Sequence, residues 1–161
     1  MAIAYLMLGS NLGDKQNNLQ LAREAISKSA GKILVISSVY ESEPWGFTHT
    51  ENFFNQIIIL ESSLKPEELL QNILGTELGM GRVRNSKEYE ARIIDIDILF
   101  FDNLIYNSET LIIPHPRIAE RRFVLLPMLE IAAELVHPVT ERTMWQMYRA
   151  CEDQLSVVRL I

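Results

Sequence analysis

The sequence predicts a single α+β domain, residues 1–161, built on an antiparallel β-sheet. Segments with the two-residue period of strands alternate with segments of helical period, and two strands follow one another between the two helices. The 161 residues are enough to bury roughly two-thirds of the surface of the unfolded chain. Hydrophobic residues make up 48% of the chain and charged residues 22%, as in ordinary globular domains.

The first half of the chain predicts three strands and one helix. Residues 2–8 are apolar and end at a glycine, as expected of a short central strand. Asp14 is a good N-cap for a helix up to about residue 28, whose apolar stripe consists of Leu19, Ala22 and Ile26. Residues 32–41 and 53–62 are rich in β-branched and aromatic side chains, which predicts the second and third strands.

The second half adds a helix and a fourth strand. Pro66, followed by two glutamates, suits the first turn of a helix that ends near Gly79. The apolar stripe of this helix consists of Leu69, Leu70, Ile73 and Leu74. Residues 91–103 predict the fourth strand. The order is therefore β-α-β-β-α-β, the split βαβ or ferredoxin-like arrangement, in which helices cover one face of an antiparallel sheet.

The remaining segments predict additions to this core. Asp102 and Asn103 suggest a hairpin turn after the fourth strand. Residues 123–135 favour a helix, Thr140 suits the N-cap of another helix, and residues 155–161 favour a final strand. No repeat or linker divides the chain, which agrees with one domain.

Two carboxylates interrupt the predicted fourth strand, "ARIIDIDILFFDN". Side chains alternate along a strand, so Asp95 and Asp97 project from one face, whereas the opposite face carries Ile94, Ile96 and Ile98. The like charges repel each other unless a cation lies between them. A wet or protected sheet edge is one explanation. The other is a magnesium site completed by phosphates, because hard oxygen ligands without nearby His or Cys favour that ion.

Positive charge is concentrated in one quarter of an otherwise acidic chain. The net charge of −6 argues against general binding to nucleic acid. Seven of the fifteen Lys and Arg residues nevertheless lie close together in sequence: Arg82, Arg84, Lys87, Arg92, Arg117, Arg121 and Arg122. Such a cluster favours a small polyanionic ligand such as a nucleotide. A histidine held between prolines, His115, is usually structural, but the arginines after it favour contact with phosphate.

The segment 79–92 connects the second helix to the aspartate strand and carries Arg82 and Arg92. One interpretation is a solvated, disordered connection. The other is a lid whose guanidinium groups close over phosphates. The length of the segment and its position before the aspartates favour the lid.

Aromatic and amide side chains suggest a second, flat ligand. Phe53 and Asn55 share one face of the predicted third strand, and Trp45 lies in the loop before it. Core aromatics beside a hydrogen-bonded amide are the more common explanation. A heteroaromatic substrate, however, needs stacking surfaces and an amide that both donates and accepts hydrogen bonds. Phe123 offers a second stacking face.

The setting expected for the protein is the cytoplasm. The N-terminus has no basic leader before its apolar run, no segment is long and apolar enough to span a bilayer, and the single cysteine, Cys151, excludes an internal disulfide. We therefore expect no membrane partner. No apolar surface stripe is left over for a dimer interface, so we expect a monomer.

Short stretches along nearly the whole chain match one enzyme family in order. They are LGSNLGDK, SVYESEPWGF, FFNQIIILES, GRVR, RIIDIDILFFDN, IPHPR and RRFVLLPMLEIAAEL. As a set they resemble the 6-hydroxymethyl-7,8-dihydropterin pyrophosphokinase family of folate biosynthesis. The resemblance implies a ferredoxin-like fold and transfer of pyrophosphate from ATP to the hydroxymethyl oxygen of the pterin, which gives AMP and the pterin diphosphate.

The resemblance also implies roles for particular residues. Two magnesium ions would be bound by Asp95 and Asp97. The transferred phosphates would be stabilised by Arg82 and Arg92. Contacts to ATP would come from Arg84, Tyr89, His115 and Arg121. The pterin would contact the backbone of Ser42 and Trp45, the amide of Asn55, and the rings of Phe53 and Phe123. One departure is Glu90-Ala91, where the family often has glycine and then a small residue or proline. No side chain is assigned as a general base.

Two other functions fit parts of the sequence. A non-enzymatic ferredoxin-like module that senses a ligand would explain a pocket but not an aspartate pair beside two arginines. An ATP phosphotransferase that moves only the γ-phosphate would use a similar magnesium site. The products of a reaction with ATP distinguish these alternatives from pyrophosphate transfer.

Overall fold

The computed structural model describes residues 1–47, 50–81 and 93–160. Within these residues, a six-stranded sheet has the order β5-β1-β4-β3-β8, and β2 also pairs with β4. Its strands are β1 (Ala2–Ser10), β2 (Lys32–Ile36), β3 (Tyr40–Ser42), β4 (Phe53–Ser62), β5 (Asp95–Phe101) and β8 (Val157–Arg159). The helices are α1 (Lys15–Ser29), α2 (Pro66–Gly79), α3 (Arg122–Ala132) and α4 (Met144–Ala150), with a 3-10 turn at Ile118–Glu120.

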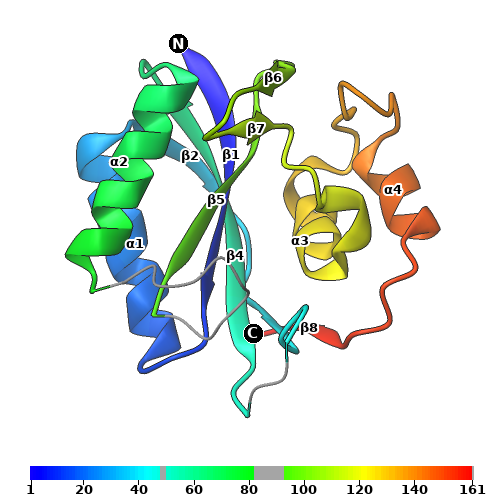
Figure 1. Ribbon diagram of the computed structural model, residues 1–161. Coiled ribbons are helices and arrows are strands. Elements are labelled where there is room, and N and C mark those ends of the chain that lie inside the picture. The colour runs from blue at the N-terminus through cyan, green and yellow to red at the C-terminus, as the bar shows by residue number, and fades with distance from the viewer. Residues whose placement is uncertain (48–49, 82–92, 161) are drawn as a thin grey trace.

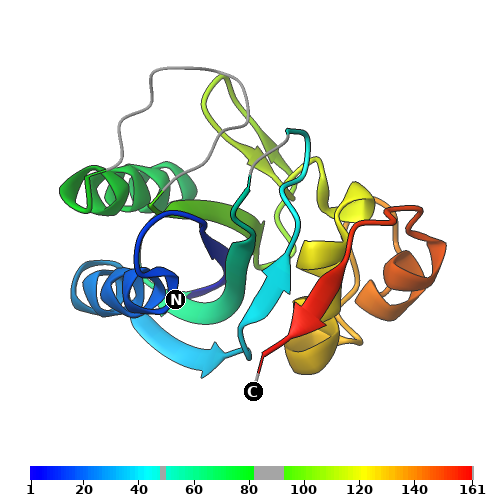
Figure 2. The same ribbon diagram turned by 90° about the horizontal axis from the view of Figure 1, so that it is seen from below.

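The helices lie on both faces of the sheet (Figures 1 and 2). Helices α1 and α2 cover one face, and α3 and α4 lie on the opposite side. Each face has its own buried apolar cluster. All described pairings in the main sheet are antiparallel. The predicted ferredoxin-like α+β fold is therefore confirmed, with the C-terminal helices forming a third layer.

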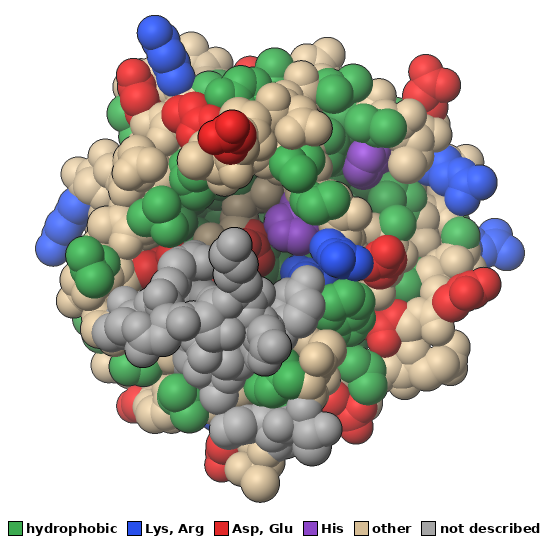
Figure 3. All heavy atoms as spheres, in the orientation of Figure 1, with side chains coloured by type: hydrophobic (Ala, Val, Ile, Leu, Met, Phe, Trp, Pro, Cys, Tyr) green, Lys and Arg blue, Asp and Glu red, His purple; other side chains and the backbone are tan. Residues whose placement is uncertain are grey.

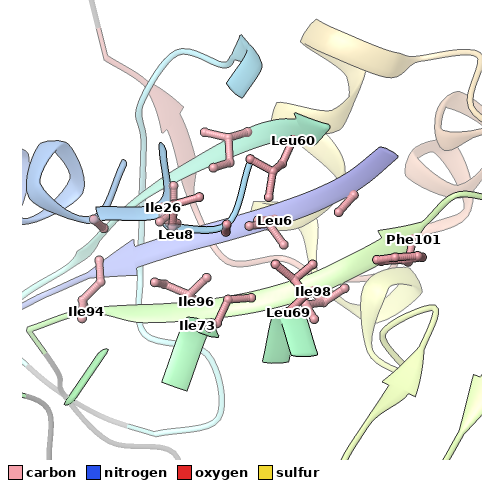
Figure 4. Packing of buried hydrophobic residues seen from close by; sticks show 14 of the residues in the cluster. Leu6, Leu8, Ile26, Leu60, Leu69, Ile73, Ile94, Ile96, Ile98 and Phe101 are labelled. Carbon is pink, nitrogen blue, oxygen red and sulfur yellow. The ribbon is translucent and has the colours of Figure 1, made fainter. Parts of the chain in front are cut away.

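Strand β5 divides its side chains between the two faces. Ile94, Ile96 and Ile98 enter the cluster under α1 and α2, where Figure 4 shows them beside Leu69 and Ile73 of α2. Leu99 belongs to the other cluster. Full burial of an isoleucine is worth about 1.5–3 kcal/mol, so these three residues fix the strand's orientation. The predicted alternation is confirmed, and it leaves both aspartates on the α3 side.

The segment predicted as one strand over 32–41 is two strands, so that prediction was wrong. Strand β2 ends at Ile36 and β3 begins at Tyr40. Between them, Ser37 uses its hydroxyl to accept a bond from Ile57 N at 2.9 Å, and Ser38 N donates to the carboxylate of Glu130 at 3.0 Å. Side chains thus replace backbone ladder bonds and interrupt the strand.

Two local predictions in the second half also needed correction. The turn at Asp102 exists, with a φ of 49°, but β5 does not continue into a hairpin there. Instead β6 (Tyr106–Asn107) pairs with β7 (Ile112–Ile113). Helix α4 is capped by Thr143, not Thr140, because Thr143 accepts a bond from Gln146 N at 3.1 Å and completes a capping box.

The outer part of strand β2 is apolar and exposed. Among the described strands, β2 pairs with β4 alone, and Leu34, Val35 and Ile36 are 38–49% exposed. The expectation that no apolar surface remains was therefore wrong, and the monomeric state stays a prediction. In the parts of the chain that the structure describes, no helix is long and apolar enough to cross a membrane.

Candidate functional site

Four residues on neighbouring strands line up across the sheet. Asp95 of β5 lies opposite Gly9 of β1, Gly9 lies opposite Asn55 of β4, and Asn55 lies opposite Tyr40 of β3. We call these four residues the site row. Residues directly opposite one another project from the same face of a sheet. Strands are spaced by about 4.8 Å, so Asp95 and Asn55 lie roughly 10 Å apart, with Gly9 between them.

Gly9 leaves the middle of the site row open. A Cβ atom added at Gly9 would lie 3.4 Å from Asn55 Oδ1 and 3.7 Å from Phe53 Cδ1. The amide and the aromatic ring therefore both border the space above this glycine. This confirms that Phe53 and Asn55 share a face, as the sequence predicts. A ligand above Gly9 would meet backbone where any other residue would place a side chain.

Asp95 and Asp97 form the acidic end of the site. Both are half-buried at the beginning of β5, and Asp97 lies opposite Met7, which belongs to the cluster on the α3 side. Among the described residues, no group of three or more His, Cys, Asp and Glu side chains is arranged to hold a metal. Two carboxylates suit magnesium, which commonly takes its remaining ligands from water and substrate phosphates. The donor set therefore fits that ion.

A third carboxylate, on helix α2, supports the same strand. Glu77 is 2% exposed, and its Oε2 accepts a hydrogen bond from Ile96 N at 2.9 Å. Because Ile96 lies between the two aspartates, this bond fixes the backbone that carries both carboxylates. The sequence analysis missed Glu77, since its position at the end of a helical stripe gives no sign of this contact.

His115 borders the acidic end in a defined tautomer. Its backbone N donates to Leu99 O at 3.0 Å, and its Nδ1 accepts from Arg117 N at 3.1 Å. The neutral ring therefore carries its proton on Nε2. Burial, assisted by the positive charges of Arg121 and Arg117 and opposed by Asp95, lowers the pKa of His115 to about 4. At neutral pH the ring is an uncharged N–H donor.

Arg121 connects the cationic and aromatic parts of the site. Its side chain is 7% exposed, and its Cζ lies 4.6 Å from the ring centroid of Trp45 and 5.6 Å from that of Phe123. Arg117 lies 6.0 Å from the same Trp45 ring. These are cation–π distances. Figure 3 shows a histidine beside basic and acidic side chains in the hollow centre of this face.

The other end of the site is held by neutral hydrogen bonds. Asn55 is 2% exposed, and its Nδ2 donates to Ser42 Oγ at 2.7 Å and to Tyr40 O at 3.3 Å. Both amide hydrogens are thus used within the protein, while Oδ1 faces the space above Gly9. The Ser42 side chain fixes this orientation, although only the backbone of Ser42 was expected to matter.

The structure brings together most of the predicted residues that it describes. Asp95, Asp97, His115 and Arg121 gather at one end, and Ser42, Phe53 and Asn55 at the other. Trp45 and Phe123 both pack on Arg121. The predicted roles of Arg82, Arg84, Tyr89 and Arg92 lie outside the described residues. Phe47 was not singled out, yet its ring stands at 90° to that of Phe53, with centroids 6.1 Å apart.

The fold has counterparts among solved structures. The HPPK-DHPS protein of Plasmodium falciparum matches with a TM-score of 0.78 at 18% sequence identity, over 92% of this chain and 44% of that chain. Another solved HPPK-DHPS protein matches with a TM-score of 0.77, over 92% of this chain and 43% of that one. At such low identity the likeness shows the fold alone.

Relatives in sequence are much closer. The 2-amino-4-hydroxy-6-hydroxymethyldihydropteridine pyrophosphokinase of Porphyromonas gingivalis is 41% identical over 143 residues, which cover 86% of this chain and 95% of that protein. The folic acid synthesis protein fol1 of Pneumocystis carinii is 45% identical over 136 residues, but this chain spans only 18% of its length. A model of the 7,8-dihydro-6-hydroxymethylpterin-pyrophosphokinase (HPPK) family matches residues 5–133. Because that match covers most of the chain, the protein belongs to this family.

Proposed function

We propose that the protein transfers the terminal diphosphate of ATP to the hydroxymethyl oxygen of 6-hydroxymethyl-7,8-dihydropterin, in folate biosynthesis. The observation that carries the proposal is the site row, in which a carboxylate and a buried amide lie on one face, two strands apart, with Gly9 between them. The acidic end suits magnesium and phosphates, and the neutral end suits a flat, hydrogen-bonding ring.

Each end of the row would do a different part of the chemistry. Asp95 and Asp97 would hold two magnesium ions, which supply positive charge that stabilises the phosphates as negative charge shifts to the leaving group. Arg121 would bind phosphate oxygens by charge-assisted hydrogen bonds, and the Nε2–H of His115 would donate to another. Neither side chain needs to change its protonation state during turnover.

The pterin would be oriented by the neutral end. Asn55 Oδ1 would accept a hydrogen bond from the pterin edge, and Phe53 and Phe123 would provide its aromatic contacts. The hydroxymethyl oxygen would then face the β-phosphorus. Its new bond to phosphorus forms as the bond to the bridging oxygen breaks, AMP leaves with that oxygen, and the hydroxymethyl proton is released. We assign no general base.

Residues of the 79–92 segment complete the proposal by family resemblance. Arg82 and Arg92 would stabilise charge in the transition state, and Arg84 and Tyr89 would contact ATP. Positioning and electrostatic stabilisation are the main means of catalysing phosphoryl transfer. Arginines that interact with the transition state more strongly than with bound ATP would therefore raise the rate more than the affinity.

Analysis of the products tests the reaction directly. The chain is incubated with ATP, magnesium and 6-hydroxymethyl-7,8-dihydropterin, and the nucleotides and pterins are separated by mass. AMP together with a pterin that has gained two phosphates is expected. ADP would instead support transfer of the γ-phosphate, and a lack of turnover with retained ligand binding would support the ligand-sensing alternative.

The proposal also covers the cellular location, the oligomeric state and the partners of the chain. Because the chain spans less than half of the solved HPPK-DHPS proteins, the activities of any longer protein are not inferred from it. We propose a cytoplasmic monomer that acts on small molecules and binds no nucleic acid. Light scattering of the purified chain tests the oligomeric state, for which the exposed apolar part of β2 is the relevant surface.

A further inference from the structure

The turn between β1 and α1, together with Lys15 at the start of α1, contacts the loop between β3 and β4. Lys15 Nζ donates to Asn52 O at 3.0 Å and pairs with Glu51 Oε2 at 3.1 Å. From the same turn, Asn11 Nδ2 donates to Glu51 O at 3.4 Å. These contacts join segments about forty residues apart in sequence. They act on the end of the loop that leads into β4.

The Lys15 ammonium is unusually enclosed for a charged group at the start of a helix. Its side chain is 16% exposed, and Nζ also lies 4.8 Å from the ring centroid of Phe54. Glu51 is 58% exposed, so the ion pair by itself contributes little, as is usual at a protein surface. The carbonyl of Asn52 and the Phe54 ring are therefore the contacts that hold Lys15 in place.

The residues that Lys15 contacts, Glu51 and Asn52, come directly before an aromatic residue that borders the proposed pterin space. Asn52 is followed by Phe53, the first residue of β4, whose ring edge borders the space above Gly9. The ring of Phe53 also meets Phe47 from the other side of the loop. The start of the loop is held separately, since Trp45 packs on Arg121. Arg121 thus holds one leg of the loop and Lys15 holds the other.

We propose that Lys15 is a positioning residue for the pterin. It holds the Glu51–Asn52 leg so that Phe53 and Phe47 keep their mutual geometry beside Asn55, and it acts through the loop without touching the substrate. This inference rests on the proposed function, because it names the pterin as the ligand of that space. Loss of the Lys15 contacts to this part of the loop would weaken pterin binding while leaving the acidic end intact.

The test compares Lys15→Met with Lys15→Arg. Methionine keeps an unbranched side chain one atom shorter than that of lysine and removes the donor and the charge. We expect the KM for the pterin to rise about fivefold, while the KM for ATP and kcat stay within twofold of the parent values. Arginine, which can bond to the same carbonyl, should restore the pterin KM to within twofold. The control is Lys28→Met, which removes the same charge from the exposed last turn of α1.

A milder variant, at an exposed partner of Lys15, tests the contribution of the ion pair alone. Glu51→Gln removes the ion pair but keeps the bond to Asn52 O, so the pterin KM should rise only about twofold. An unchanged pterin KM in Lys15→Met, or an equal rise in the KM for ATP, would overturn the positioning role. So would a fivefold rise in Lys28→Met.

Direct binding separates this inference from the proposed reaction. Calorimetry measures the affinity for the pterin in the presence of magnesium and a non-hydrolysable ATP analogue. If the parent protein binds the pterin and forms no AMP, the proposed activity is wrong, and the Lys15 variants still report on positioning through their affinities. If the parent protein does not bind the pterin, both proposals are wrong.

Discussion

The two ends of the site row are held in different ways. At the neutral end, Asn55 is fixed by Ser42 Oγ and Tyr40 O, so the protein itself supplies the partners of its amide group. At the acidic end, Asp95 and the positive charge of Arg121 both act on an uncharged His115, and Asp97 lies two residues further along the same strand. The neutral end is preorganised for a small ring, whereas the acidic end is a set of charges suited to an ionic ligand.

This contrast predicts opposite signatures for substitutions at the two ends. Changes at the acidic end should act on the rate, because charge is rearranged there during the reaction. Changes at the neutral end should act on the affinity for the pterin, because in the proposed mechanism that end only holds and orients it. The following predictions test this division.

The largest effect is expected at the aspartates. Asp95→Asn or Asp97→Asn should lower the magnesium-dependent kcat by about a thousandfold or more, because each removes a negative charge that the proposed mechanism uses to hold the metal. Steady-state kinetics and circular dichroism measure activity and folding. Glu109→Gln, which removes one exposed charge, is the control. Near-normal turnover in either aspartate variant would remove the metal assignment.

The next largest effect is expected at Asn55. Asn55→Leu keeps the branching of the side chain but removes its amide, and it leaves Ser42 Oγ and Tyr40 O without this donor. The pterin KM should rise about 10- to 100-fold, and unfolding should become easier by about 1–3 kcal/mol, because buried polar groups lose a partner. Urea denaturation and kinetics measure the two effects.

The affinity for ATP is the internal control for that variant. A direct titration with a non-hydrolysable ATP analogue should give a dissociation constant within twofold of the parent value. If the affinity for the nucleotide fell as much as the affinity for the pterin, the two ends of the site row would not act independently. The proposed division between rate and pterin affinity would then be wrong.

The sequence predicts much of this arrangement because strand geometry is local. The alternation of isoleucine and aspartate in β5 assigns both carboxylates to one face, and the structure confirms it. Phe53 and Asn55 are two residues apart on β4, so their shared face follows in the same way. What the sequence does not give is register. That Gly9 separates Asp95 from Asn55 depends on pairings between strands that are far apart in the chain.

Side-chain contacts across the fold were missed for the same reason. Glu77, Lys15 and Phe47 each act on a residue that is distant in sequence or lies across a loop. The split of residues 32–41 into two strands depends on Glu130, which lies about ninety residues further along the chain. Periodicity carries no information about such partners, whereas family resemblance proposes ligand residues without showing which side chains hold them in place.

A smaller effect is expected at the glycine between the two ends. Gly9→Ala places a methyl group 3.4 Å from Asn55 Oδ1, an ordinary contact that the fold can accept. If the pterin lies over Gly9 as proposed, the methyl group takes up part of its space, so the pterin KM should rise about threefold with an unchanged melting temperature. An unaffected KM would show that the pterin does not lie over Gly9.

Gly31 offers a matched control. A Cβ at Gly31 would collide with the backbone oxygen of Glu61, far from the site row. Gly31→Ala should therefore lower the melting temperature and leave the pterin KM of the folded fraction unchanged. The pair of alanine variants thus separates loss of ligand space from loss of stability.

The acidic end should also make the stability of the protein depend on pH. Burial lowers the pKa of His115 to about 4, below its ordinary value of 6.5. As pH falls from 6.5 to 4, the unfolded chain therefore binds a proton that the folded protein does not. Stability should decline through this window, with a slope of at most about 1.4 kcal/mol per pH unit for one proton. The contribution is fully present above pH 6.5.

Denaturation of the ligand-free protein at several pH values tests this, with His115→Gln as the comparison. Burial also lowers the pKa of His137, which stays in the variant and so cancels from the difference. The stability of the parent protein should fall more steeply between pH 6.5 and 4 than that of His115→Gln. Parallel curves would mean that His115 has the same pKa in the folded and unfolded states, so that burial does not keep the ring uncharged. The ring would then gain its positive charge as the pH falls through about 6.5, and the acidic end would contain one more charge that changes with pH.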